Sequence, residues 1–115
     1  SYEDKQDYHR VLDAMRDAQQ RFATGIYAVW YPLVQRSESH RMAAGLEKAA
    51  GGDWLNASLK VCAPPEDGLG LYGSGMFVFN PPWNLEGALQ ETLPALARLL
   101  GQDGSASYKL KFRQT

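Results

Sequence analysis

Four residues that could act on a nucleic-acid base, Asn80-Pro81-Pro82-Trp83, directly follow the apolar run Gly75-Met76-Phe77-Val78-Phe79. An amide oxygen and a proline-linked carbonyl can accept hydrogen bonds from an exocyclic amine, and an indole ring can stack on a base. No glycine-rich phosphate or nucleoside loop follows a strand upstream of this tetrapeptide. The other interpretation, which is preferred, is a stiff Pro-Pro exit from a strand into a capped helix.

The composition sets broad limits on function. A chain of 115 residues fits one domain, and its formal charge of -1 argues against a strongly basic nucleic-acid scaffold, although a local basic patch stays open. The lone Cys62 cannot form an internal disulfide, and His9 and His40 have no partners at ligand spacing, so no metal site is predicted. No targeting segment or membrane-length apolar run is present, and we expect a cytoplasmic protein that does not act in a membrane.

Hydrophobic periodicity predicts the elements that must position these residues. Apolar side chains at three- and four-residue steps predict three helices, and apolar or alternating runs predict four strands. In chain order these are helix 4–21, strand 26–31, helix 37–51, strand 55–62, strand 75–79, helix 84–101 and strand 106–113. Pro32 is expected to end the first strand, Ser37 or Ser39 and Asn84 to cap the second and third helices, and Pro94 to kink the third.

The strand 26–31 carries the strongest signal for the type of sheet. Its apolar side chains run without alternation, a pattern typical of parallel strands covered by helices on both faces. Helices and strands alternate along the chain, and no internal repeat or linker interrupts them. The sequence therefore predicts a single α/β unit with this strand inside a parallel sheet.

Three separated blocks together resemble a known family: 21–32 (Arg-Phe-Ala-Thr-Gly-Ile-Tyr-Ala-Val-Trp-Tyr-Pro), Gly73-Ser74-Gly75-Met76 and Asn80-Pro81-Pro82-Trp83. In order and spacing they resemble the ribosomal RNA large subunit methyltransferase J family along essentially the whole chain. This resemblance implies a transferase that moves a methyl group from S-adenosylmethionine to N6 of an adenine in 23S ribosomal RNA, on a Rossmann-like domain with a helical insertion. It implies rRNA processing and RNA binding as the biological context.

The resemblance also places the catalytic motif. The family's Asp-Pro-Pro-Tyr aligns so that Ser1 stands at the second proline and Tyr2 at the aromatic, which puts the catalytic aspartate before the first residue given. Residues 1–115 would then be one C-terminal segment of the methyltransferase domain, without the upstream half that binds S-adenosylmethionine, and inactive alone. Tyr2 is expected to stack on the target base. Which residues here would touch the cofactor is not predicted.

Other residues are expected at or near the same pocket. Ligands in open α/β sheets lie beyond the carboxyl ends of strands, which makes Trp30, Tyr31 and Pro32 the substrate-binding candidates, with one aromatic of the pair directed to each side. Asn80 and Trp83 are secondary candidates. A basic stripe of Lys109, Lys111 and Arg113 either contacts RNA phosphates or simply protects an edge strand from aggregation. The Gly73-Ser74-Gly75 segment is expected to be a flexible hairpin turn, and the alternative is a close approach to a nucleotide backbone.

Two further expectations concern partners. Without upstream neighbours, the strand 26–31 would expose an apolar edge through which the fragment could self-associate. The alternative function is a non-enzymatic binding or assembly module involved in nucleic-acid handling or the use of external DNA. The residues encoded before Ser1 distinguish these hypotheses, because the fragment hypothesis requires Asp-Pro there.

Overall fold

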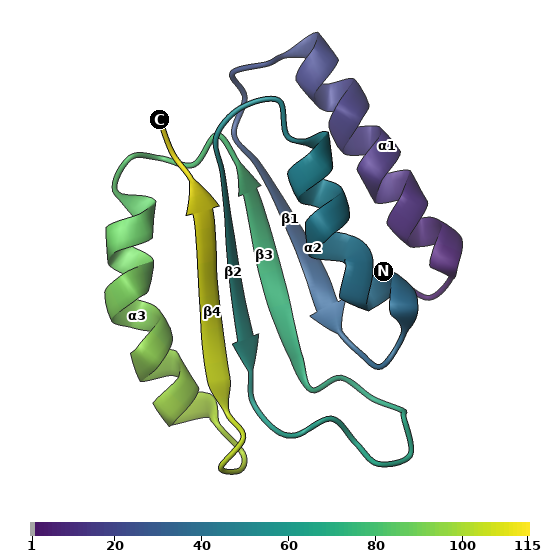
Figure 1. The fold of residues 1–115 in the computed structure, drawn as a ribbon, viewed down its shortest axis with the longest axis vertical. Helices are drawn as coiled ribbons and strands as arrows, with labels where there is room; N and C mark the ends of the chain where they lie inside the picture. Colours follow the sequence, from purple (N-terminus) through teal and green to yellow (C-terminus); the bar gives the residue numbers. More distant parts are fainter. Residues whose placement is uncertain (1) are drawn as a thin grey trace.

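The computed structural model describes residues 2–115 and contains three helices and four strands (Figure 1). In chain order they are α1 (Lys5–Arg21), β1 (Tyr27–Leu33), α2 (Ser37–Ala49), β2 (Trp54–Lys60), β3 (Gly73–Phe79), α3 (Leu85–Leu100) and β4 (Ser107–Arg113). All seven predicted elements are present in the predicted order. Ser1, which the family resemblance aligns with the second proline of the catalytic motif, lies outside the described residues.

The four strands form one sheet in the order β1-β3-β2-β4, and every pairing is antiparallel. The prediction that the strand 26–31 lies in a parallel sheet is therefore wrong for the part of the chain that the structure describes. An unbroken apolar run indicates that both faces of the strand are hydrophobic. It does not determine whether the neighbouring strand is parallel or antiparallel. The α/β class itself is correct.

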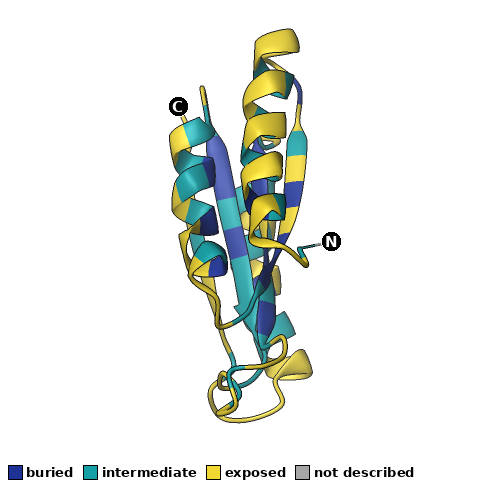
Figure 2. Ribbon diagram, turned by 90° about the vertical axis from the view of Figure 1, so that its right-hand side faces the viewer, coloured by how far each residue is buried: buried dark blue, intermediate teal, exposed yellow. Residues whose placement is uncertain are grey.

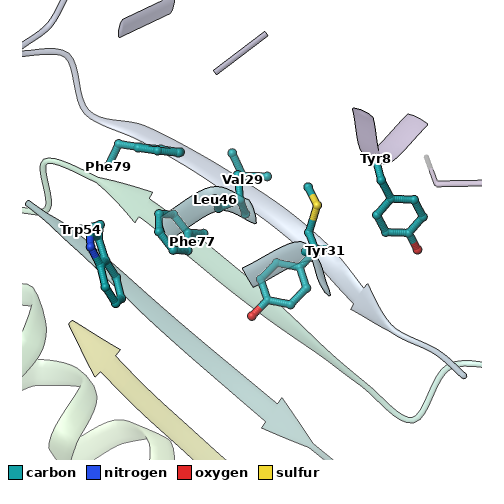
Figure 3. Close-up of a cluster of buried hydrophobic side chains, with 8 residues drawn as sticks. Tyr8, Val29, Tyr31, Leu46, Trp54, Phe77 and Phe79 are labelled. Atoms are coloured by element: carbon teal, nitrogen blue, oxygen red, sulfur yellow. The ribbon is translucent and has the colours of Figure 1, made fainter. Parts of the chain in front are cut away.

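Helices cover both faces of the sheet. On one face α1 and α2 enclose the larger core, in which Phe77 and Leu46 are completely inaccessible to solvent and Trp54 stacks on Phe77 with ring centroids 5.4 Å apart (Figure 3). On the other face α3 packs its Leu93 against Leu55 and Ala57 of β2. Burying these apolar surfaces is the main force that holds the layers together.

The second face is only partly covered. Figure 2 shows long exposed stretches on the outer sides of the helices, and exposure also reaches the sheet, where Trp30 on β1 is 45% exposed and Met76 on β3 is 39% exposed. Because α3 packs on β2 and β4 rather than on β1 and β3, these two side chains remain accessible beside it. β1 is moreover an edge strand in the described chain, as the fragment hypothesis expects.

Several local predictions are corrected by the structure. Pro32 does not end its strand, since β1 runs on to Leu33, and an edge strand tolerates a residue without an N–H. The Gly73-Ser74-Gly75 segment is the start of β3 and not a turn, because it pairs with both β1 and β2. A Cβ at Gly75 would clash with the ring of Tyr31, so only glycine fits there. The N-cap of α2 is Arg36 and not Ser37 or Ser39. Asn84 occupies the N-cap position of α3 as predicted, but its side chain makes no cap hydrogen bond.

Ser39 has a different role. It is buried, donates from its hydroxyl to the carbonyl oxygen of Pro32 over 2.7 Å, and accepts from the backbone N–H of Val34 over 3.3 Å. These two bonds fix the short connection between β1 and α2. The end of β1, where the candidate site lies, is thereby held rigidly against the following helix.

Candidate functional site

An open groove of about 540 Å³ lies beside the carboxyl end of β1. That end of β1 is its lower end in Figure 1. Its walls come from the N-terminal segment, the end of β1, the start of α2 and the loop 61–72. The lining residues are Tyr2, Glu3, Trp30, Pro32, Val34, Gln35, Arg36, Gly68, Leu69 and Gly70. The groove brings Tyr2 together with two of the three residues predicted from the end of the strand.

Tyr2 is held in place by its neighbours. Its hydroxyl donates to the backbone carbonyl of Trp30 over 2.6 Å, and its ring lies 4.8 Å from that of Tyr8 and 6.1 Å from that of Trp30. Burial raises the pKa of the Tyr2 hydroxyl to about 12, and the neighbouring Tyr8 adds to the rise. The hydroxyl therefore stays protonated and engaged with the backbone, which leaves the ring as the part of Tyr2 that could meet a ligand.

The residues that follow Tyr2 anchor the same segment. Nη1 of Arg36, at the start of α2, donates to the carbonyl oxygen of Glu3 over 3.2 Å. Asp4 then caps α1 by accepting from the backbone N–H of Gln6, and its own N–H is bonded to the carboxylate of Asp7. The segment that carries Tyr2 is thus fixed to β1, α2 and α1.

Trp30 and Tyr31 point to opposite faces of β1, as predicted. Trp30 is 45% exposed and lines the groove together with Pro32. Tyr31 is only 3% exposed, and its hydroxyl donates to Oδ1 of Asn56 over 2.6 Å inside the main core. Burial raises the pKa of Tyr31, and the bond to Asn56 opposes this rise. The structure therefore places Tyr31 outside the groove, because side chains alternate along a strand.

The glycine-rich loop 61–72 supplies a further wall of the groove. Leu69 is 71% exposed and stands between Gly68 and Gly70, both of which have positive φ angles. Gln35 donates to the carbonyl oxygen of Pro65 over 3.0 Å, which ties the loop to the β1–α2 connection. In the sequence, Gly68-Leu69-Gly70 indicates this position, because glycines on both sides of an apolar residue allow a tight turn that presents its side chain.

The secondary candidates lie at the other end of β1. Asn80 follows Phe79, which pairs with Tyr27 at the start of that strand, whereas the groove lies beside its end. Nδ2 of Asn80 donates to the carbonyl oxygens of Ala23 and Gly25 over 2.9 and 2.8 Å, and its backbone has a φ of 54°. Trp83 is 86% exposed. The structure thus does not bring Asn80 and Trp83 together with Tyr2.

The described residues do not fit a site for S-adenosylmethionine. A nucleoside or phosphate loop normally follows a strand and is rich in glycine. The two connections here that lead from a strand into a helix, Val34–Arg36 and Asn80–Asn84, contain no glycine. Between residues 2 and 115, no three His, Cys, Asp or Glu side chains gather as a metal site. Across the same residues, no helix combines the length and apolar character needed to cross a membrane.

Comparisons with known proteins agree with the family suggested by the sequence. Two curated proteins named ribosomal RNA large subunit methyltransferase J are similar: one from Haemophilus influenzae, 41% identical over 111 residues, and one from Escherichia coli, 44% identical over 95 residues. These alignments cover 96% and 83% of the chain. The chain spans only 39% and 34% of the two relatives.

A solved structure gives the same picture for the fold. A crystal structure of a Legionella pneumophila protein superposes with a TM-score of 0.83 at 27% sequence identity, over 96% of this chain and 40% of that protein. The family model described as ribosomal RNA large subunit methyltransferase D, RlmJ, matches residues 1–113. The chain therefore belongs to the RlmJ family of ribosomal RNA large subunit methyltransferases.

Proposed function

We propose that this chain is the C-terminal part of an enzyme that transfers a methyl group from S-adenosylmethionine to N6 of an adenine in 23S ribosomal RNA. The groove beside β1 would hold the target adenine after it leaves its stack, because a base inside a helix cannot reach an active site. The names and lengths of the relatives support this proposal over a stand-alone assembly module. Since ribosomal RNA would be the substrate, the enzyme would act in the cytoplasm.

The observation that carries the proposal is the geometry of Tyr2. Its hydroxyl is bonded to the backbone of β1, and its ring lines the groove beside Trp30. An aromatic ring fixed in this way offers a stacking surface for a base without having to be ordered on binding. Trp30 and Pro32 would form the neighbouring wall, and Leu69 would approach from the loop 61–72.

The remaining parts of the site would come from the rest of the longer protein. In the proposed enzyme an aspartate immediately upstream accepts a hydrogen bond from the N6 amine and orients it. S-adenosylmethionine supplies the methyl group and would be bound upstream. The edge of β1 that has no neighbouring strand among residues 2–115 supports this arrangement, because it is where further strands of a Rossmann-like sheet would join.

Substitutions of Tyr2 in the longer protein test the proposal. Tyr2→Ala should lower kcat/KM for methylation of unmodified ribosomal RNA by roughly 5- to 150-fold, since stacking on an aromatic ring is worth about 1–3 kcal/mol per base. Tyr2→Phe keeps the ring and loses only the bond to Trp30, so its loss should be below that of Tyr2→Ala and at most about fivefold. The measurement is transfer of a labelled methyl group to the RNA.

Trp83→Ala is the matched control, because this aromatic side chain is exposed and lies at the opposite end of β1. It should methylate at the parental rate. An undiminished rate for Tyr2→Ala would refute the stacking role, and equal losses for Tyr2→Ala and Trp83→Ala would show that the assay reports stability rather than substrate contact.

A further inference from the structure

A second groove, of about 290 Å³, lies at the same end of the sheet as the Tyr2 groove. It sits over the end of β2 and the start of β4. The side chains that give it polar and aromatic character are Ser58, Lys60, Tyr72, Ser107, Tyr108 and Lys109. None of them belongs to the Tyr2 groove, and only Lys109 was singled out from the sequence.

Strand register explains why two lysines meet there. In the antiparallel pairing of β2 with β4, Ser58 lies opposite Lys109 and Lys60 lies opposite Ser107. Residues in opposite positions project from the same face, so the two ammonium groups and the two hydroxyls form a diagonal arrangement on one side of the sheet. Two lysines at diagonal positions on one face repel each other, and a bound anion would offset that repulsion.

The predicted basic residues of β4 therefore have different surroundings: Lys109 lines the groove, and Lys111 does not. Lys111 is already engaged: its Nζ lies 3.0 Å from the carboxylate of Glu47 on α2 and 5.8 Å from the ring centroid of Trp54. Lys60 and Lys109 form no salt bridge within residues 2–115. The carboxylate of Asp103 lies near Lys60, but it accepts hydrogen bonds from the backbone N–H groups of Ala63 and Ser105.

The two grooves are connected by the loop 61–72. This loop contributes Pro64 and Tyr72 to the lysine groove and residues 68–70 to the Tyr2 groove, and adjacent residues at the end of β1 line one groove each, Leu33 and Pro32. The distance across the sheet from β1 to β4 is three strand spacings, roughly 14 Å. Because Pro32 and Leu33 project to opposite faces of β1, the two grooves open on opposite sides of the sheet at the same end. A single strand of RNA whose target base enters the Tyr2 groove would reach the lysines by passing around the loop at this end of the sheet.

We propose that the groove between Lys60 and Lys109 binds the phosphate backbone of the RNA that flanks the target adenine. Two lysines that form no salt bridge among the described residues, next to the half-buried ring of Tyr72, provide charge for the backbone of a single-stranded RNA and an aromatic surface for a base. A chain with a net charge of -1 needs such a local patch, because its overall charge does not attract RNA. This inference rests on the proposed function.

The experiment measures binding of a short fluorescent single-stranded RNA to the 115-residue chain by anisotropy, over a series of salt concentrations. The double variant Lys60→Ala, Lys109→Ala should bind about tenfold more weakly at low salt. The slope of log affinity against log salt should become shallower by about 1.4, since each phosphate contact to a single strand contributes about 0.7. Circular dichroism would establish that the variant is folded.

The control is the double variant Lys48→Ala, Arg98→Ala. It removes the same charge from two exposed positions on α2 and α3 and should retain the parental salt slope. Equal weakening in both double variants, an unchanged slope in the first, or no binding by the parent chain at low salt would overturn the inference. None of these results would affect methyl transfer dependent on Tyr2, which is measured in the longer protein.

Discussion

At the scale of single residues, Tyr2 and Asn80 have different roles, although both belong to segments that resemble a catalytic motif. The hydroxyl of Tyr2 donates a hydrogen bond to the backbone of β1, and its ring lines a groove. The side-chain amide of Asn80 instead donates to two backbone carbonyls of the α1–β1 connection. Asn80 also adopts a positive φ, which asparagine tolerates better than most residues. The chemistry that its motif suggests is thus used to close a turn.

Asn80→Ala should therefore destabilise the fold and leave the groove intact. Two hydrogen bonds are lost and an alanine is forced into the left-handed region, which together should lower the free energy of unfolding by about 2 kcal/mol. Urea denaturation followed by circular dichroism measures this. Asn84→Ala is the matched control, because Asn84 makes no side-chain cap bond and its loss should change little. A stable Asn80→Ala variant with impaired methylation in the longer protein would contradict this structural role.

At the scale of elements, most of the structure could be predicted from periodicity. The helical spacing around Tyr8, Leu46 and Leu93 identified α1, α2 and α3, and the positions of the strands followed from apolar and alternating runs. Strand direction could not be predicted in this way, because partners distant in the sequence decide it. The run from Tyr27 to Tyr31 is apolar on both faces whether its neighbour is parallel or antiparallel.

The candidate site was only partly predictable for the same reason. Family resemblance pointed to Tyr2, and the end of a strand pointed to Trp30 and Pro32. Arg36 and Leu69 were missed, because they reach the groove through contacts across 33 residues and through the shape of a loop. Tyr31 was selected with Trp30 by proximity in sequence, although the alternation of a strand sends it into the core.

The open edge of β1 leads to a prediction for the isolated chain. The strand has a neighbour on one side only within residues 2–115, and Trp30 beside that edge is exposed. We expect self-association through this edge, visible as an average mass that rises with concentration in size-exclusion chromatography with light scattering. Tyr2 already occupies the Trp30 carbonyl and Pro32 lacks an N–H, so the association should be weak.

Ala28→Lys should abolish this association, because a charged side chain on an edge strand discourages pairing with another chain. Ala44→Lys adds the same charge at an exposed position on α2 and should associate like the parent. A monomeric parent over a wide concentration range, or loss of association in both variants alike, would rule out the β1 edge as the contact.

At the scale of the whole molecule, the chain presents a groove that we propose forms one side of an active site. The Tyr2 groove opens at the end of the sheet where β1, the loop 61–72 and the N-terminal segment meet (Figure 1). The strand-to-helix connections lack the glycines that a nucleoside loop needs. The glycines instead gather between residues 68 and 75, ahead of a strand, where they shape the loop and admit the ring of Tyr31.

The absence of glycine from these strand-to-helix connections leads to a prediction for S-adenosylmethionine binding. Calorimetric titration should detect binding to a protein extended upstream through the missing part of the family sequence, and none to the 115-residue chain. Trp83→Ala in the longer protein should bind the cofactor like its parent, because the segment 80–84 closes a turn at the far end of β1. Binding to the short chain would instead mean that this segment or the loop 61–72 forms a cofactor site. If the loop 61–72 were that site, the groove beside Tyr2 would have to be reassigned from the target base to the methyl donor.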